Sequence, residues 1–160
     1  MSKPSPPSVF LSPSQFLAHW QGHRRVTRRV IEAFPEGALF GYRVEPMRPF
    51  GEIALELLAM AAPMVRGVVT GDWEAYAPPE AATHEELLRL WDEATNEIDE
   101  LWPQIPTARF QERTTAFGQY EDVGRNLFLY VIDNEIHHRG QGYVYLRALG
   151  VEPPAFWERD

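Results

Sequence analysis

The sequence of 160 residues contains no cysteine, which excludes a disulfide framework, a thiolate metal site and a cysteine nucleophile. It is also short of positive charge, since 15 lysines and arginines stand against 23 aspartates and glutamates, for a formal net charge of -8. An acidic chain lacks the positive field that attracts nucleic acids and anionic membranes. We therefore expect neither a nucleic acid nor a membrane among its partners.

Long hydrophobic runs are missing as well. The most apolar segment, residues 53–69, is interrupted by Glu56, Pro63 and Arg66, so the sequence predicts no transmembrane helix. Residues 1–7 lack the continuous apolar core of a signal peptide. From these two absences we expect a cytoplasmic protein.

Helical periodicity dominates the rest of the chain. A flexible N-terminal tail is expected over residues 1–11, which are rich in proline and serine, followed by one domain over residues 12–160. Sequences typical of a capping box stand at Ser12–Gln15 and at Thr83–Glu86. Apolar residues recur at helical spacing in four segments, approximately 13–34, 49–69, 83–102 and 120–149. No strong strand alternation competes with them, although the connection over residues 103–120 has room for a short strand near residues 109–116. These patterns predict an all-α protein, most simply a four-helix bundle.

The last of these helices carries a polar stretch, Asp133–Gln141, where an apolar core face is expected. At about 100° per residue, His138 points in the same direction as Leu127, and Asn134 lies beside it one turn earlier. His137 points about 100° away from His138. A buried imidazole needs hydrogen-bond partners, so the stretch is either a polar network in the core or a metal or substrate site between helices.

The same stretch resembles the DinB family, also called DinB/YfiT-like. Agreement with the family pattern is found at Trp20, 26–30, 48–53, 134–141, 145–147 and Gly150. The resemblance implies a four-helix bundle of up-down-down-up topology, usually a homodimer. It also implies a divalent metal ion, often nickel or zinc, held by three histidines of the second and fourth helices.

Carried over position by position, the three ligand positions fall on Glu56, Asn134 and His138. Only His138 is a histidine, so this chain departs from the family pattern at the other two positions. The resulting donor set is rich in oxygen and suits a harder or more weakly held ion, such as manganese, as well as nickel or zinc.

Two functions follow from the resemblance. The first is a divalent-metal-dependent enzyme acting on a small-molecule substrate, either as a thiol transferase or as a hydrolase, with Glu135 or His137 as the candidate base. The second is a non-catalytic dimer of the same fold that acts in a stress response or binds a ligand or partner. The sequence leaves both open.

Overall fold

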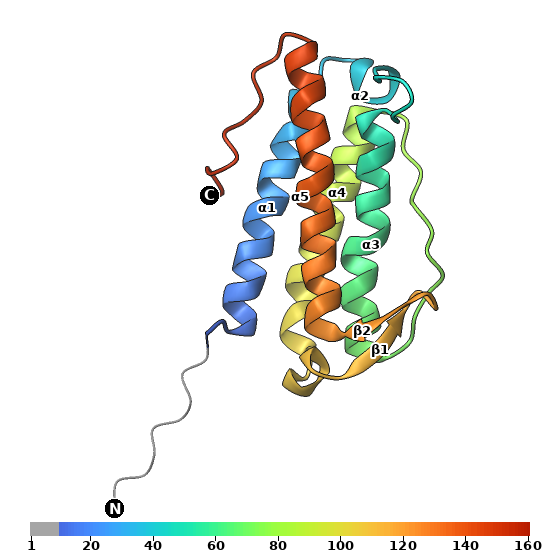
Figure 1. Ribbon diagram of the computed structural model, residues 1–160, viewed down its shortest axis with the longest axis vertical. Helices are drawn as coiled ribbons and strands as arrows, with labels where there is room; N and C mark the ends of the chain where they lie inside the picture. The colour runs from blue at the N-terminus through green and yellow to red at the C-terminus, as the bar shows by residue number, and fades with distance from the viewer. Residues whose placement is uncertain (1–9) are drawn as a thin grey trace, which may run out of the picture.

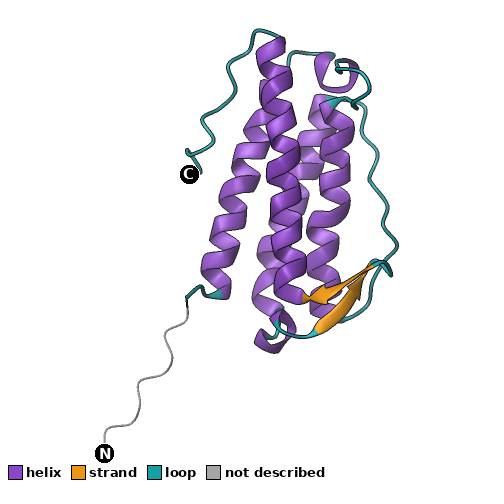
Figure 2. Ribbon diagram, in the orientation of Figure 1, coloured by secondary structure: helices purple, strands orange, loops and turns teal. Residues whose placement is uncertain are grey.

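The computed structural model describes residues 10–160, so the tail expected over residues 1–11 falls outside the described residues except for its last two positions. Four long helices stand side by side, with a small hairpin at one end and a short helix at the other (Figures 1 and 2). In chain order the elements are α1 Pro13–Ala33, α2 Ala38–Gly41, α3 Phe50–Thr70, α4 His84–Leu101, the 3₁₀ turns η1 Trp102–Gln104 and η2 Thr107–Phe110, β1 Arg113–Ala116, β2 Tyr120–Val123 and α5 Gly124–Ala148.

Both predicted capping boxes are present. At the start of α1 the Ser12 hydroxyl accepts from the Gln15 backbone at 3.2 Å, and the Gln15 side chain accepts from the Ser12 backbone at 2.9 Å. Thr83 and Glu86 make the same reciprocal pair before α4. These side chains satisfy backbone donors that the first helical turn leaves unpaired, which is why the helices begin where the sequence predicts.

The bundle has the up-down-down-up topology expected from the resemblance. α1 and α5 run upward in Figure 1, whereas α3 and α4 both run downward and are joined by a long connection along the outside. Around the bundle the neighbouring pairs are α1 with α4, α4 with α3, α3 with α5, and α5 with α1. α5 therefore faces α1 on one side and α3 on the other.

The start of α5 differs from the prediction of a helix beginning near Tyr120. Residues 120–123 form β2, which pairs antiparallel with β1, and the helix begins only at Gly124. The turn between the strands contains two successive left-handed residues, Phe117 and Gly118, and is closed by a 3.0 Å hydrogen bond from Gln119 to Ala116. Pairing between strands thus overrides the helical propensity of the segment.

Helix α3 is long and apolar enough to cross a membrane when judged by length and composition alone. In the bundle most of this helix is buried against α4 and α5, as in the core helix of a soluble protein. Its residue Phe50 stacks on Phe34, which directly follows α1, with ring centroids 5.1 Å apart, and also packs against Gly142 of α5. A Cβ atom at Gly142 would lie 2.7 Å from the Phe50 ring, so the close approach of α3 and α5 requires glycine there.

Candidate functional site

The structure brings two of the three expected ligand residues together across the α3–α5 interface. Nε2 of His138 lies 3.4 Å from Oε1 of Glu56, although the two residues are 82 positions apart in the sequence. On its other side, Nδ1 of His138 lies 2.9 Å from Oε1 of Gln141, one turn later on α5. Because an amide oxygen only accepts, Nδ1 carries the proton in this hydrogen bond, which leaves Nε2 directed at the carboxylate.

Glu56 has a second partner. Its Oε2 receives a hydrogen bond from the guanidinium of Arg48, which precedes α3 and is half exposed. The backbone of Arg48 is itself held in place, because the hydroxyl of Tyr145 donates to its carbonyl at 2.9 Å. The carboxylate of Glu56 is therefore positioned between a cationic side chain and an imidazole.

Asn134, the third expected ligand residue, lies one turn before His138 and has a different partner. Its amide nitrogen donates to the Sδ atom of Met60 at 3.6 Å. Residues four apart on each helix thus form successive contacts, first Glu56 with His138 and then Met60 with Asn134. Within residues 10–160, no three side chains from histidine, cysteine, aspartate or glutamate are grouped so as to hold a metal ion.

The prediction that His138 lies at the centre of the core-facing row is wrong. The polar residues that point into the core are Glu135 and Arg139, whose exposed fractions are 2% and 4%, whereas the side chain of His138 is 14% exposed. The most buried direction of α5 runs through Phe128, and His138 lies about 80° from it, on the side of α3. Helix α5 has two packed sides, and the sequence pattern alone does not separate them.

Glu135 and Arg139 form a buried polar network with α1. The carboxylate of Glu135 accepts from the Thr27 hydroxyl at 2.6 Å and from the Trp20 indole at 3.4 Å. The Arg139 guanidinium donates to the backbone carbonyl of His23 at 3.0 Å and contacts His23 Nδ1 at 3.1 Å. Since Glu135 lies inside this network and His137 is exposed, neither is placed to act as a base at Glu56 and His138.

The α1 arginines, whose polar run suggests a solvated face, have three different roles. Arg24 is fully buried, with Nε donating to Thr95 at 2.9 Å and the guanidinium lying 4.2 Å from the Trp91 ring centroid. Burial lowers the pKa of Arg24, and the nearby charge of Glu135 opposes that effect. Arg28 pairs with Asp92. The remaining two, Arg25 and Arg29, donate to backbone carbonyls of the C-terminal segment.

That C-terminal segment runs back along the bundle beside α1 (Figure 1). Its residue Arg159 packs against Gly22 and is close enough for its charge to act on His23 in the buried network. It is anchored by polar contacts such as the 2.6 Å hydrogen bond from the Tyr143 hydroxyl to the Pro154 carbonyl, while the side chains of Phe156 and Trp157 are exposed. Aromatic residues near a terminus usually pack onto the core, so their exposure here differs from the expectation. The pKa of His23 is lowered to about 3. Burial has the largest effect, followed by the charges of Arg139 and Arg159 and then by His19.

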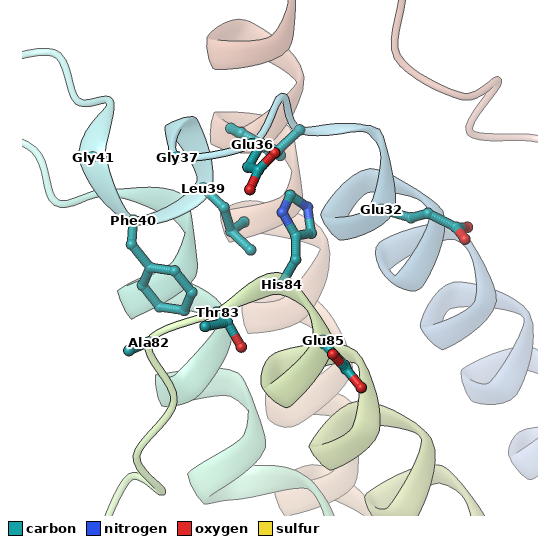
Figure 3. A pocket seen from close by; sticks show the side chains of 11 residues that line it. Glu32, Glu36, Gly37, Leu39, Phe40, Gly41, Ala82, Thr83, His84 and Glu85 are labelled. Atoms are coloured by element: carbon teal, nitrogen blue, oxygen red, sulfur yellow. The ribbon is translucent and has the colours of Figure 1, made fainter.

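A hollow of about 850 Å³ lies between α2 and the start of α4, at the end of the bundle opposite the hairpin (Figure 1). Figure 3 shows that the carboxylates of Glu32 and Glu85 point away from its central residue, His84. Nε2 of His84 is engaged with the backbone carbonyl of Ile31 at 2.7 Å. Glu36 lies beside His84 in the same view, but the other two acids do not join it, so no cluster of acids forms around His84 and the candidate reacting groups remain Glu56 and His138.

The similarities to known proteins agree with this architecture. A family model described as the DinB family matches residues 1–160. The uncharacterized protein YjoA of Bacillus subtilis is 25% identical over 150 residues, which span 91% of this chain and 97% of YjoA.

Two solved structures share the fold. The crystal structure of the DinB-like protein YjoA from Bacillus subtilis has a TM-score of 0.73 at 22% identity, covering 91% of this chain and 99% of that one. A DinB-like protein from Bacillus cereus has a TM-score of 0.70 at 15% identity, covering 92% of this chain and 99% of that one. The bundle topology, the motif on α5 and the match over the whole sequence lead to one conclusion: this chain belongs to the DinB family.

Proposed function

We propose that this protein is a cytoplasmic, divalent-metal-dependent enzyme that acts on a small molecule, with the ion held between Glu56 and His138. The observation that carries the proposal is the facing pair of Glu56 Oε1 and His138 Nε2 at 3.4 Å. At this separation a carboxylate oxygen and an imidazole nitrogen could both be ligands of a single divalent ion. The hydrogen bond from Nδ1 to Gln141 supports the proposal, because metal-binding imidazoles usually donate their other nitrogen in this way.

The donor set fits a weakly held ion better than a tightly held one. Glu56 and His138 supply one carboxylate and one imidazole, and Asn134 supplies an amide whose oxygen is a neutral donor. Water has to complete the coordination shell of such a set. An ion that accepts oxygen ligands, such as manganese, suits this combination, whereas nickel and zinc prefer the imidazoles that this chain has replaced.

A bound divalent ion would lower the pKa of a thiol or a water molecule, so that the thiol or water becomes a nucleophile at neutral pH. The protein's own groups would position the reactants. Gln141 holds the His138 ring in one tautomer, and Arg48 presents a half-exposed guanidinium beside Glu56, where it can receive an anionic group of the substrate. Thiol transfer and hydrolysis differ in the nucleophile and share these residues.

Metal binding by protein purified without a histidine tag tests the proposal directly. We expect titration calorimetry with manganese, nickel or zinc chloride to detect about one ion per chain, and the ion to raise the melting temperature. His138→Ala should abolish both effects. His137→Ala is the matched control, because the neighbouring histidine is exposed and should be dispensable. An unliganded wild type, or equal losses in the two variants, would refute the metal site.

A second candidate function has its own observation in favour. Arg48 already balances the charge of Glu56, so the carboxylate does not require an ion as its counter-charge. In this case the protein is a non-catalytic family member that binds a ligand or partner in a stress response. Arg48→Met separates the two functions: it should strengthen metal binding if an ion competes with the guanidinium, and should only lower stability if none does.

Self-association is part of both functions. Leu129, Ile136 and Val144 are exposed along one outer face of α5, and at Gly140 between them no atom lies within 4 Å of where a Cβ would be. An apolar helical stripe with a small residue at its centre suits packing against the same helix of a second copy. Light scattering at micromolar concentration should give a dimer, and Val144→Glu should give a monomer.

A further inference from the structure

A hollow of about 320 Å³ lies at the hairpin end of the α3–α5 interface. Its walls include Met60 and Met64 of α3, Leu127 and Tyr130 of α5, and Tyr120 of β2. The hairpin therefore supplies one wall of a cavity whose other walls are two helices of the bundle. The turn at Phe117 and Gly118 places β2 there, because it folds the chain back directly before α5.

This hollow continues the row of contacts that begins at Glu56 and His138. Moving along α3 in steps of four, Glu56 faces His138, Met60 faces Asn134, and Met64 lines the hollow. Eight residues of helix rise about 12 Å, and Met60, where the hollow begins, lies one turn or about 6 Å along α3 from Glu56. The polar pair and the hollow are thus two ends of one strip along α3 and α5, with Met60 belonging to both parts.

The walls of the hollow combine two half-exposed tyrosines with two methionines that are buried in the core, Met60 and Met64, at 7% and 1% exposed. Tyr120 and Tyr130 are stacked, with ring centroids 6.3 Å apart and an interplanar angle of 26°, yet they are 49% and 51% exposed. Flat aromatic faces and the polarizable sulfur atoms of Met60 and Met64 offer favourable contacts to another ring. Exposed apolar side chains gathered in a concave site are typical of a ligand site.

The charges around the hollow are negative. Glu121 and Asp122 of β2 stand at its edge, and hydrogen bonds from the Val123 backbone and from Asn126 lower the pKa of Asp122. Asp122 is therefore ionised at neutral pH. Arg113 pairs with Glu121 and offsets its charge, so Asp122 supplies the charge that an entering carboxylate or sulfonate would meet. None of the residues that line the hollow is cationic.

We infer that the hollow binds an uncharged aromatic group of the substrate, while the polar end of the same molecule reaches Glu56 and His138. The inference deepens the proposed function, and only its second half rests on the metal site. Recognition of the ring depends on Tyr120, Tyr130 and the two methionines, none of which is a proposed ligand of the ion. Binding of a ring can therefore be measured with no ion present.

A pair of fluorescent probes tests the assignment in buffer containing a chelator. N-phenylnaphthylamine is uncharged, and anilinonaphthalene sulfonate has the same rings with a negative charge. We expect the uncharged probe to bind more tightly. Tyr130→Ala should weaken its binding about three- to tenfold, which corresponds to the loss of one aromatic contact. Phe156→Ala is the matched control, because its aromatic side chain is 54% exposed but does not line the hollow.

Each outcome decides one part of the inference. Equal loss in Tyr130→Ala and Phe156→Ala, or no binding by the wild type, would overturn the ring site, and tighter binding of the sulfonate would overturn the assigned charge. His138→Ala should leave probe binding unchanged in the chelator while abolishing metal binding. Failure of the metal site and failure of the ring site are therefore observed in separate measurements.

Discussion

The two polar sides of α5 differ in how completely their groups are satisfied. Glu135 and Arg139 face α1, whereas Asn134 and His138, each one position earlier, face α3. A shift of one residue turns the side chain by about 100° around the helix, which is enough to reach the other neighbour. One polar stretch of sequence thus serves two interfaces.

On the side of α1 the charged groups are buried and have short hydrogen bonds to neutral partners. On the side of α3 they are partly exposed, and one of them, Glu56, is shared between a guanidinium and an imidazole. A buried polar network with its partners complete specifies how two helices pack. A partly open set has polar atoms accessible to a ligand. The difference teaches that the family motif on α5 combines a structural half with a half suited to chemistry.

Removing the buried acid should have the largest effect. Glu135→Ala removes the acceptor of the Thr27 and Trp20 hydrogen bonds and leaves the charges of Arg24 and Arg139 without their nearby anion. We expect the free energy of unfolding to fall by about 3 kcal/mol, measured by urea denaturation at pH 7. Glu56→Ala on the other side should cost less than about 1 kcal/mol because that ion pair is exposed to solvent. Equal losses would remove the distinction between the two sides.

Replacing Asn134 by histidine, as the family resemblance implies, should strengthen metal binding on the side of α5 that faces α3. Asn134→His places two imidazoles four residues apart on the side facing α3, where both can reach one ion. We expect the affinity for nickel or zinc to rise about tenfold or more, or roughly 1.4 kcal/mol, in titration calorimetry. Asp133→His is the control, since that exposed neighbour points elsewhere. A similar gain in both variants would mean that any added surface histidine suffices.

Acid should weaken the structural half through His23. Its pKa is lowered from 6.5 to about 3 in the folded protein, so only the unfolded chain gains this proton as the pH falls below 6.5. Stability from this residue is therefore complete above pH 6.5 and is lost progressively toward pH 3. His23→Asn keeps an acceptor for Arg139 without titrating. Between pH 7 and 5 we expect the wild type to lose about 1 kcal/mol more than the variant, a figure reduced for partial screening by solvent.

Helix positions followed well from local signals, because capping boxes and apolar periodicity act within a few residues. Local signals do not predict which neighbouring helix a polar residue of α5 faces, because this depends on which helices flank α5. His138 was expected in the core on the strength of its alignment with Leu127, but the centre of burial lies at Glu135 and Arg139. No local signal marks Arg24 as buried either, because its partners Trp91 and Thr95 lie on another helix.

For the candidate site, the family resemblance names Glu56 and His138, and the structure places them in a contact that spacing within one helix does not reveal. Glu56 and His138 meet because α3 and α5 run antiparallel in register. The role of Arg48 was missed, since its contact with Glu56 depends on how the chain enters α3. The ring site was missed for a similar reason: Tyr120 belongs to a strand that periodicity assigned to the helix.

The smallest predicted effect concerns the C-terminal segment that runs beside α1. Tyr143→Phe removes the hydrogen bond to the Pro154 carbonyl and should lower the free energy of unfolding by about 0.5 kcal/mol in urea at pH 7. The charge of Arg159 in that segment helps to lower the pKa of His23. Loosening the segment should therefore also reduce the stability that the protein loses between pH 7 and 5. Metal binding at Glu56 should not change. If Tyr143→Phe also lowered the metal affinity, the side of α5 that faces α1 and the side that faces α3 would be energetically coupled through the helix.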